Sequence, residues 1–121
     1  MNLYGIANCD TVRKARGWLT QHQITYTFHD FKKTGVTVAQ LSAWAEQVGW
    51  EKLLNRQGTT WRRLPDTTKA GINSAAAAFT LMAAQPSCIK RPVLACRDQL
   101  LVGFNETEYA AILTTEFSAR I

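Results

Sequence analysis

The sequence has few cysteines and histidines and lacks any long hydrophobic run. Three cysteines among 121 residues are odd in number and widely spaced, which argues against a disulfide framework and for a reducing compartment. His22 and His29 do not stand at ligand spacing from a cysteine, so no metal site is expected. No apolar run reaches about 18 residues, and no basic segment precedes an apolar one at the N-terminus. We therefore expect a cytoplasmic protein without a membrane partner.

Internal repeats and low-complexity segments are also absent, and the length of 121 residues indicates one domain with its own core. The formal net charge is +5, but the basic clusters accompany no recognised nucleic-acid-binding motif. This argues against nucleic acid as a partner and favours a small anionic ligand or an acidic protein surface. We expect a monomer.

The most informative residue is Cys9, which lies between a predicted strand and a predicted helix. The run from Asn2 to Ile6 is typical of a short buried strand, and apolar residues recur at helical spacing from Asp10 onward. Cys9 therefore stands at or just before a first helical turn, where free N–H groups and the helix dipole stabilise a thiolate. Such a position lowers a cysteine pKa from ~8.5 toward ~3.5–7.5. Arg13, one turn further on, adds positive charge. The alternative is a cysteine that packs as a small hydrophobe.

The rest of the chain alternates between strand and helix patterns. A second strand at 25–29 completes a strand–helix–strand unit, whose strands should run parallel. Residues 35–85 are helical in character, and the tail returns to two strands and a helix. The expected details are a helix after the capping residue Thr37 that ends at Gly49, a loop at 55–64, a short helix after Pro65, a helix at 73–84 ended by Pro86, strands at 92–96 and 100–104 joined by a turn at 97–99, and a last helix capped by Asn105.

This order of elements predicts an α/β domain that is interrupted by helices. A cysteine after the first strand and a proline opening the third strand are the arrangement of the thioredoxin fold. We expect a mixed four-stranded sheet with the order β-α-β, helical insert, β-β-α. The thioredoxin-like part takes residues 1–34 and 86–121, and the helical insert takes residues 35–85.

Three separated motifs, in order, carry a resemblance to a known family. They are Tyr4-Gly5-Ile6 with Asn8-Cys9-Asp10-Thr11, Leu54-Asn55 with Gly58-Thr59-Thr60-Trp61-Arg62, and Pro86 with Ile89-Lys90-Arg91-Pro92. The chain resembles the arsenate reductase (ArsC) family, and most closely its Spx/YffB branch. The resemblance implies that Cys9 is the nucleophile, that Arg91 helps to bind an oxyanion, and that Pro92 is cis and packs against the cysteine. A surface cation beside a strand is the simpler alternative for Arg91.

Within this resemblance, the chain fits a glutathione-dependent thiol reductase that uses one cysteine. Val12 stands where Spx-type regulators carry the second cysteine of a Cys-x-x-Cys switch, so Cys9 has no partner within its helix. We expect no bound cofactor and glutathione as co-substrate, which would release Cys9 from a mixed disulfide. Cys88 is the internal alternative for that step, and Cys96 is expected in the core. Candidate substrate-binding residues are Asn8, Thr11, Arg13, Arg56 and Pro92, with Arg62 and Arg63 as alternatives to Arg56 for a glutathione carboxylate.

Other functions stay open at this point. The resemblance implies further anion-binding arginines for an arsenate reductase, but Asn55 stands at one of these places and residues 101–103 contain no arginine at another. A non-catalytic regulator that binds RNA polymerase is a second alternative, and its basic surface would face an acidic partner. A fold kept for another interaction, with an inert Cys9, is a third.

Overall fold

The computed structural model describes residues 1–118, with side chains to residue 113, so the last three residues of the expected thioredoxin-like part lie outside it. Its sheet has the strand order β2-β1-β3-β4. Strand β1 (Asn2–Gly5) runs parallel to β2 (Thr27–Asp30) and antiparallel to β3 (Val93–Cys96), which pairs antiparallel with β4 (Gln99–Val102). The expected mixed four-stranded sheet of a thioredoxin-like fold is confirmed.

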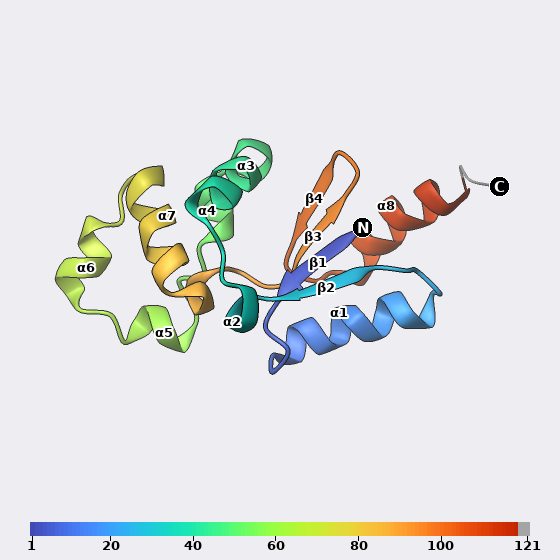
Figure 1. Cartoon of the computed structure of the whole chain (residues 1–121), viewed down its shortest axis with the longest axis horizontal. Helices are drawn as coiled ribbons and strands as arrows, with labels where there is room; N and C mark the ends of the chain where they lie inside the picture. Colours follow the sequence, from blue (N-terminus) through green and yellow to red (C-terminus); the bar gives the residue numbers. More distant parts are fainter. Residues whose placement is uncertain (119–121) are drawn as a thin grey trace.

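Two helices accompany the sheet, and a group of short helices extends from it (Figure 1). Helices α1 (Asp10–Gln21) and α8 (Glu106–Ser118) follow β1 and β4. The chain between β2 and β3 consists of short helices joined by loops, namely α2 (Phe31–Thr34), α3 (Val38–Val48), α4 (Trp50–Leu53), α5 (Thr59–Arg62), α6 (Asp66–Gly71), α7 (Ala75–Ala84) and the 3-10 turn η1 (Pro86–Cys88). The domain division at residues 35 and 86 stays a prediction; the segment between those residues contains α3 to α7.

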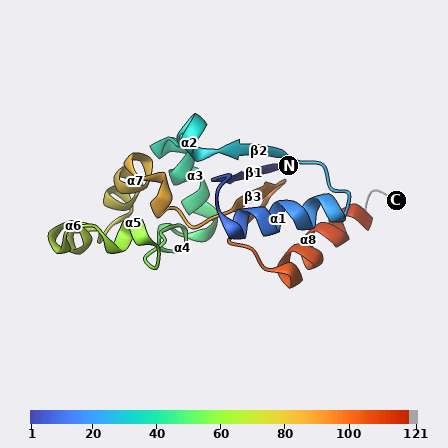
Figure 2. The same cartoon turned by 90° about the horizontal axis from the view of Figure 1, so that it is seen from below.

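Alternate residues of the strands point to opposite faces of the sheet and build two cores. Leu3, Leu94 and Leu101 join α1 and α8 in one core, and these two helices lie together below the sheet in Figure 2. On the other face, Val93 and Leu100 pack with side chains of α3, α4 and α7. The first core holds α1 against the sheet, and the second holds the helical insert against it.

Predicted caps agree with the structure, whereas several boundaries do not. Thr37 Oγ1 accepts the Gln40 N–H at 3.1 Å at the start of α3, and Asn105 Oδ1 accepts the Glu108 N–H at 3.0 Å at the start of α8. The expected loop at 55–64 contains the helical turn α5, and α7 starts after the capping residue Ser74 rather than at residue 73.

The expected turn at 97–99 is wrong by one residue. Gln99 pairs with Cys96 in the ladder, which leaves Arg97 and Asp98 as a two-residue turn. Arg97 has a positive φ of 53°, as one central residue of such a tight hairpin requires. Strand β2 is likewise shifted to 27–30, because it forms where β1 provides a parallel partner. None of the helices within residues 1–118 is long and apolar enough to cross a membrane.

Candidate functional site

Cys9 is the N-cap residue of α1, as the sequence predicts. Its backbone is extended (φ −140°, ψ 126°), and its carbonyl oxygen accepts the Arg13 N–H at 2.9 Å, which is the first bond of the helix. The side chain is half-buried, and the backbone N–H groups of Thr11 and Val12 act on its sulfur. The unpaired N–H groups of the first helical turn therefore face the thiol.

The close approach of β1 and α1 fixes the direction of these N–H groups. A Cβ on Gly5 would lie 2.8 Å from Cγ2 of Val12, a distance that side chains do not tolerate. Val12 itself is fully buried. The absence of a side chain at Gly5 thus lets the first turn of α1 rest on the end of β1. Because Val12 fills the space three residues after Cys9, no second thiol stands within the helix.

Arg91 approaches Cys9 from the segment that enters β3. The peptide bond between Arg91 and Pro92 is cis, as the resemblance implies. Arg91 Nη1 donates to the Ser87 carbonyl at 2.9 Å, while its Nε is buried and has no hydrogen-bond partner among the described residues. The guanidinium lowers the pKa of the Cys9 thiol, both as a hydrogen-bond donor to the thiolate and by its charge.

Burial and the groups around Cys9 have opposite effects on the pKa of its thiol. Burial by itself raises the pKa of Cys9, but the Val12 N–H, the hydrogen bond and charge of Arg91, and the Thr11 N–H together outweigh it. The pKa of Cys9 consequently lies below its ordinary value. Burial raises the pKa of Cys88, and the charge of Arg91 offsets this only in part. Cys88 is 0% and Cys96 2% exposed, so Cys9 is the thiol that a reagent reaches first.

Asn8 and Arg13 lie beside Cys9 on the exposed surface, where they bond to each other rather than to the sulfur. Arg13 donates to Oδ1 of Asn8 and forms an ion pair with Asp10. Arg13 is not among the groups that shift the pKa of Cys9, although it lies only one turn away. The side chain of Thr11 is exposed, and its backbone N–H is the part that acts on Cys9. The roles of Asn8, Thr11 and Arg13 in substrate binding stay predictions.

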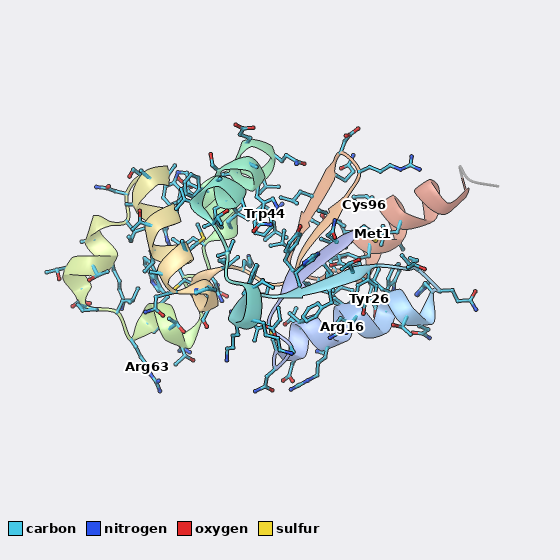
Figure 3. The ribbon with its side chains drawn as sticks, viewed as in Figure 1. Met1, Arg16, Tyr26, Trp44, Arg63 and Cys96 are labelled. Atoms are coloured by element: carbon cyan, nitrogen blue, oxygen red, sulfur yellow. The ribbon has the colours of Figure 1, made fainter. Side chains whose placement is uncertain are left out.

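Arg56 belongs to the helical insert and lies between two tryptophans. Its Cζ is 6.0 Å from the centroid of Trp50 and 5.7 Å from that of Trp61, within range of a cation–π interaction. Arg63 projects outward from the insert in Figure 3. A role for Arg56 or Arg63 in holding a carboxylate stays a prediction. Within residues 1–118, no group of three potential metal-ligating side chains occurs.

Backbone groups are the part of the site that sequence reasoning missed. The Val12 N–H and the Ser87 carbonyl carry no side-chain signal, and the contact between Gly5 and Val12 depends on how α1 returns to β1. In the sequence, only the family motif points to Arg91, because its separation from Cys9 along the chain gives no reason to pair them.

The fold and this site together define a thioredoxin-like protein with one accessible cysteine at a helix N-terminus. Comparison with known proteins specifies the family. The ArsC family model matches residues 4–112, and the chain belongs to the ArsC family. The expected family is thereby confirmed.

Two relatives match this chain over nearly its whole length. A solved structure named YFFB (PA3664) protein is 49% identical with a TM-score of 0.88 and covers 93% of this chain and 97% of its own. An uncharacterised protein of Haemophilus influenzae is 40% identical over 111 residues, which is 92% of this chain and 96% of that protein.

A more distant relative is named as a regulator. The global transcriptional regulator Spx 2 of Bacillus cereus is 28% identical over 114 residues, which is 92% of this chain and 85% of that protein. The Spx/YffB branch is therefore represented among the relatives by both of its names.

Proposed function

We propose that this protein is a glutathione-dependent thiol reductase that works through Cys9 alone. The observation that carries the proposal is the convergence on Cys9 of two backbone N–H groups and the guanidinium of Arg91, which lowers the pKa of the thiol. A thiolate is the form that attacks a disulfide. At a partly exposed position it is available to a dissolved substrate.

The reaction proceeds in two balanced exchanges. The Cys9 thiolate attacks the glutathione sulfur of a mixed disulfide, forms a Cys9–glutathione disulfide and releases the substrate sulfur as a thiolate. A second glutathione then attacks as thiolate, which restores the Cys9 thiolate and leaves oxidised glutathione. The proton given up by that glutathione passes to the released substrate thiolate. The net reaction reduces one mixed disulfide and forms one molecule of oxidised glutathione.

The second thiol comes from solution because the chain offers no accessible one. Val12 occupies the dithiol position, and Cys88 is fully buried with a raised pKa. Arg91 supplies the positive charge that an incoming glutathione carboxylate requires, and its buried Nε lacks a partner among the described residues.

Exposure to oxidised glutathione, followed by mass measurement of the intact chain, tests this proposal. We expect one glutathione per chain at Cys9, its release by reduced glutathione, and turnover of a mixed disulfide of glutathione and a small thiol. Cys9→Ser should abolish all three, whereas Lys14→Ala, an exposed cation on the same helix, should abolish none. A chain that takes up no glutathione, or that turns over without Cys9, would contradict the proposal.

The same assay should also measure whether the protein reduces arsenate. Asn55 stands where such an enzyme is expected to carry an arginine, and its side chain accepts the Gln57 N–H at 3.0 Å within its own loop. We therefore expect arsenate to be turned over far more slowly than the mixed disulfide. Faster turnover of arsenate would make the oxyanion the substrate.

Regulation of transcription is the second candidate function, and the relatives named Spx favour it. RNA polymerase is the partner that the family resemblance implies. Binding to purified RNA polymerase should be measured with the wild-type chain and with Cys9→Ser. Tight binding that survives Cys9→Ser, in a chain without reductase turnover, would favour the regulator over the enzyme.

A further inference from the structure

Two segments that are far apart in the sequence are paired immediately before Arg91. Leu54 and Ile89 form an isolated antiparallel bridge outside the sheet. Two backbone hydrogen bonds flank it, from the Asn55 N–H to the Cys88 carbonyl at 2.7 Å and from the Lys90 N–H to the Leu53 carbonyl at 2.7 Å. We call this pairing of residues 53–55 with residues 88–90 the clip.

Four of the six residues of the clip are buried, whereas Asn55 is partly exposed and Lys90 is exposed. Leu53, Cys88 and Ile89 are 0% exposed and Leu54 is 5% exposed. Opening the clip would break two backbone hydrogen bonds whose acceptor carbonyls belong to the buried residues Leu53 and Cys88, which is costly. The clip therefore gives the segment before Arg91 a defined position.

The segment before Arg91 holds both the backbone and the guanidinium of that residue. Its backbone follows Lys90 directly, and its Nη1 donates to the Ser87 carbonyl at 2.9 Å, just before the clip. Within the described part of the chain, its Nε makes no hydrogen bond. A displacement of residues 87–90 would carry the guanidinium with it, away from Cys9.

Asn55 is the last residue that the helical insert contributes to the clip, and the loop before α5 follows it. Besides its backbone bond in the clip, its Oδ1 accepts the Gln57 N–H at 3.0 Å. Its Nδ2 would lie 2.9 Å from a Cβ on Gly58, the residue that precedes α5. The amide side chain of Asn55 thus lies within the loop that leads from the clip to α5.

We infer that the clip holds Arg91 in place beside Cys9, so that the helical insert positions the guanidinium at the thiol site through Asn55. This inference rests on the proposed function and assigns the insert a part in it. Asn55 is a positioning residue, because it acts through Arg91.

The pH dependence of Cys9 alkylation, followed by peptide mapping, tests the inference. Asn55→Pro removes the N–H of the clip, and Leu54 before it already has the extended backbone that a following proline requires (φ −81°, ψ 124°). We expect Asn55→Pro to raise the pKa of Cys9 by ~0.5 unit or more, a loss of about threefold in alkylation rate below both pKa values. Asn55→Ala should shift it less and in the same direction.

Asn105→Ala is the matched control, since Asn105 makes the same kind of side-chain-to-backbone bond at α8. It should lose stability to a similar extent as Asn55→Ala and leave the pKa of Cys9 unchanged. Amide hydrogen exchange at Lys90 should be faster in the Asn55 variants and unaltered in Asn105→Ala. If Asn55→Pro does not fold, Asn55→Ala and Gly58→Ala decide the question.

Arg91→Ala distinguishes a failure of the inference about the clip from a failure of the proposed function. If it raises the pKa of Cys9 while every folded Asn55 variant retains the wild-type value, the inference about the clip is wrong and the proposed function stands. If Arg91→Ala leaves the pKa unchanged, the activation in the proposed function is wrong, and the clip has no effect to transmit.

Discussion

Replacing Gly5 by alanine tests how firmly the first turn of α1 is held against β1. The backbone of Gly5 does not have positive φ, so alanine meets no conformational penalty there. Its Cβ, however, would lie 2.8 Å from Cγ2 and 3.3 Å from Cγ1 of the buried Val12. The cost of the substitution therefore comes from this one contact, and it falls on the turn whose N–H groups face Cys9.

The expected magnitude follows from two opposing effects. Overpacking of a dense interior costs about 1–3 kcal/mol. Replacing glycine by alanine also lowers the entropy of the unfolded chain, which stabilises the folded state by roughly 0.4–1 kcal/mol. With the middle of both ranges, Gly5→Ala should destabilise the fold by about 1.3 kcal/mol, which lowers Tm by roughly 5 °C for a domain of this size. Because the Val12 N–H is displaced, the pKa of Cys9 should also rise.

Urea denaturation of Gly5→Ala, Val12→Ala and the double variant measures the contact directly. Val12→Ala removes both methyl groups that the new Cβ meets. The double variant should thus be more stable than the sum of the single effects predicts, by roughly 1 kcal/mol or more. Strict additivity, or a Gly5→Ala chain as stable as the wild type, would refute the packing described for this turn.

The remaining predictions concern Tyr109 in the first core and the reactivity of individual side chains. Tyr109 is 1% exposed, and its hydroxyl has no hydrogen-bond partner within residues 1–118, so Tyr109→Phe should keep or raise the free energy of unfolding by up to about 1 kcal/mol. A clear loss of stability on denaturation would reveal a bond to that hydroxyl. Arg13→Ala should leave the pKa of Cys9 nearly unchanged, in contrast to Arg91→Ala, because the Arg13 guanidinium pairs with Asp10. Equal upward shifts in the two variants, measured by thiol titration, would contradict this. Native alkylation should label Cys9 well before Cys88 and Cys96, and denaturant should equalise the three. Early labelling of Cys88 in the folded chain would show that the second core opens.

Local signals in the sequence were sufficient for much of the fold. Thr37 and Asn105 were identified as caps because their side chains bond to N–H groups only three residues away. Cys9 was placed at the start of α1 because the helical spacing of apolar residues begins just after it. The sequence pattern places Gln99 in the turn. Its place in β4 follows from pairing with Cys96 across the hairpin, and a local pattern does not show that pairing.

Local sequence patterns also fail to predict the contacts that build the site. Nearness in the sequence favoured Arg13 as a charge acting on Cys9, but Asp10 and Asn8 bond to its guanidinium first. Arg91 exerts the charge instead, since the sheet brings β3 beside β1. The sequence does not predict the clip, because the clip joins backbone groups of two segments that are far apart along the chain.

We propose that the fold activates the Cys9 thiol, and that Cys9 forms a disulfide with glutathione without a second cysteine of the chain. The most direct test is the rate of Cys9 alkylation as a function of pH, measured by peptide mapping on the wild-type chain and on Arg91→Ala. A lowered pKa keeps the thiolate present where an ordinary thiol is protonated, so half of the maximal rate should be reached below pH ~8.5. Arg91→Ala should move that midpoint upward. A midpoint at or above ~8.5 in the wild type, unchanged by Arg91→Ala, would contradict the account.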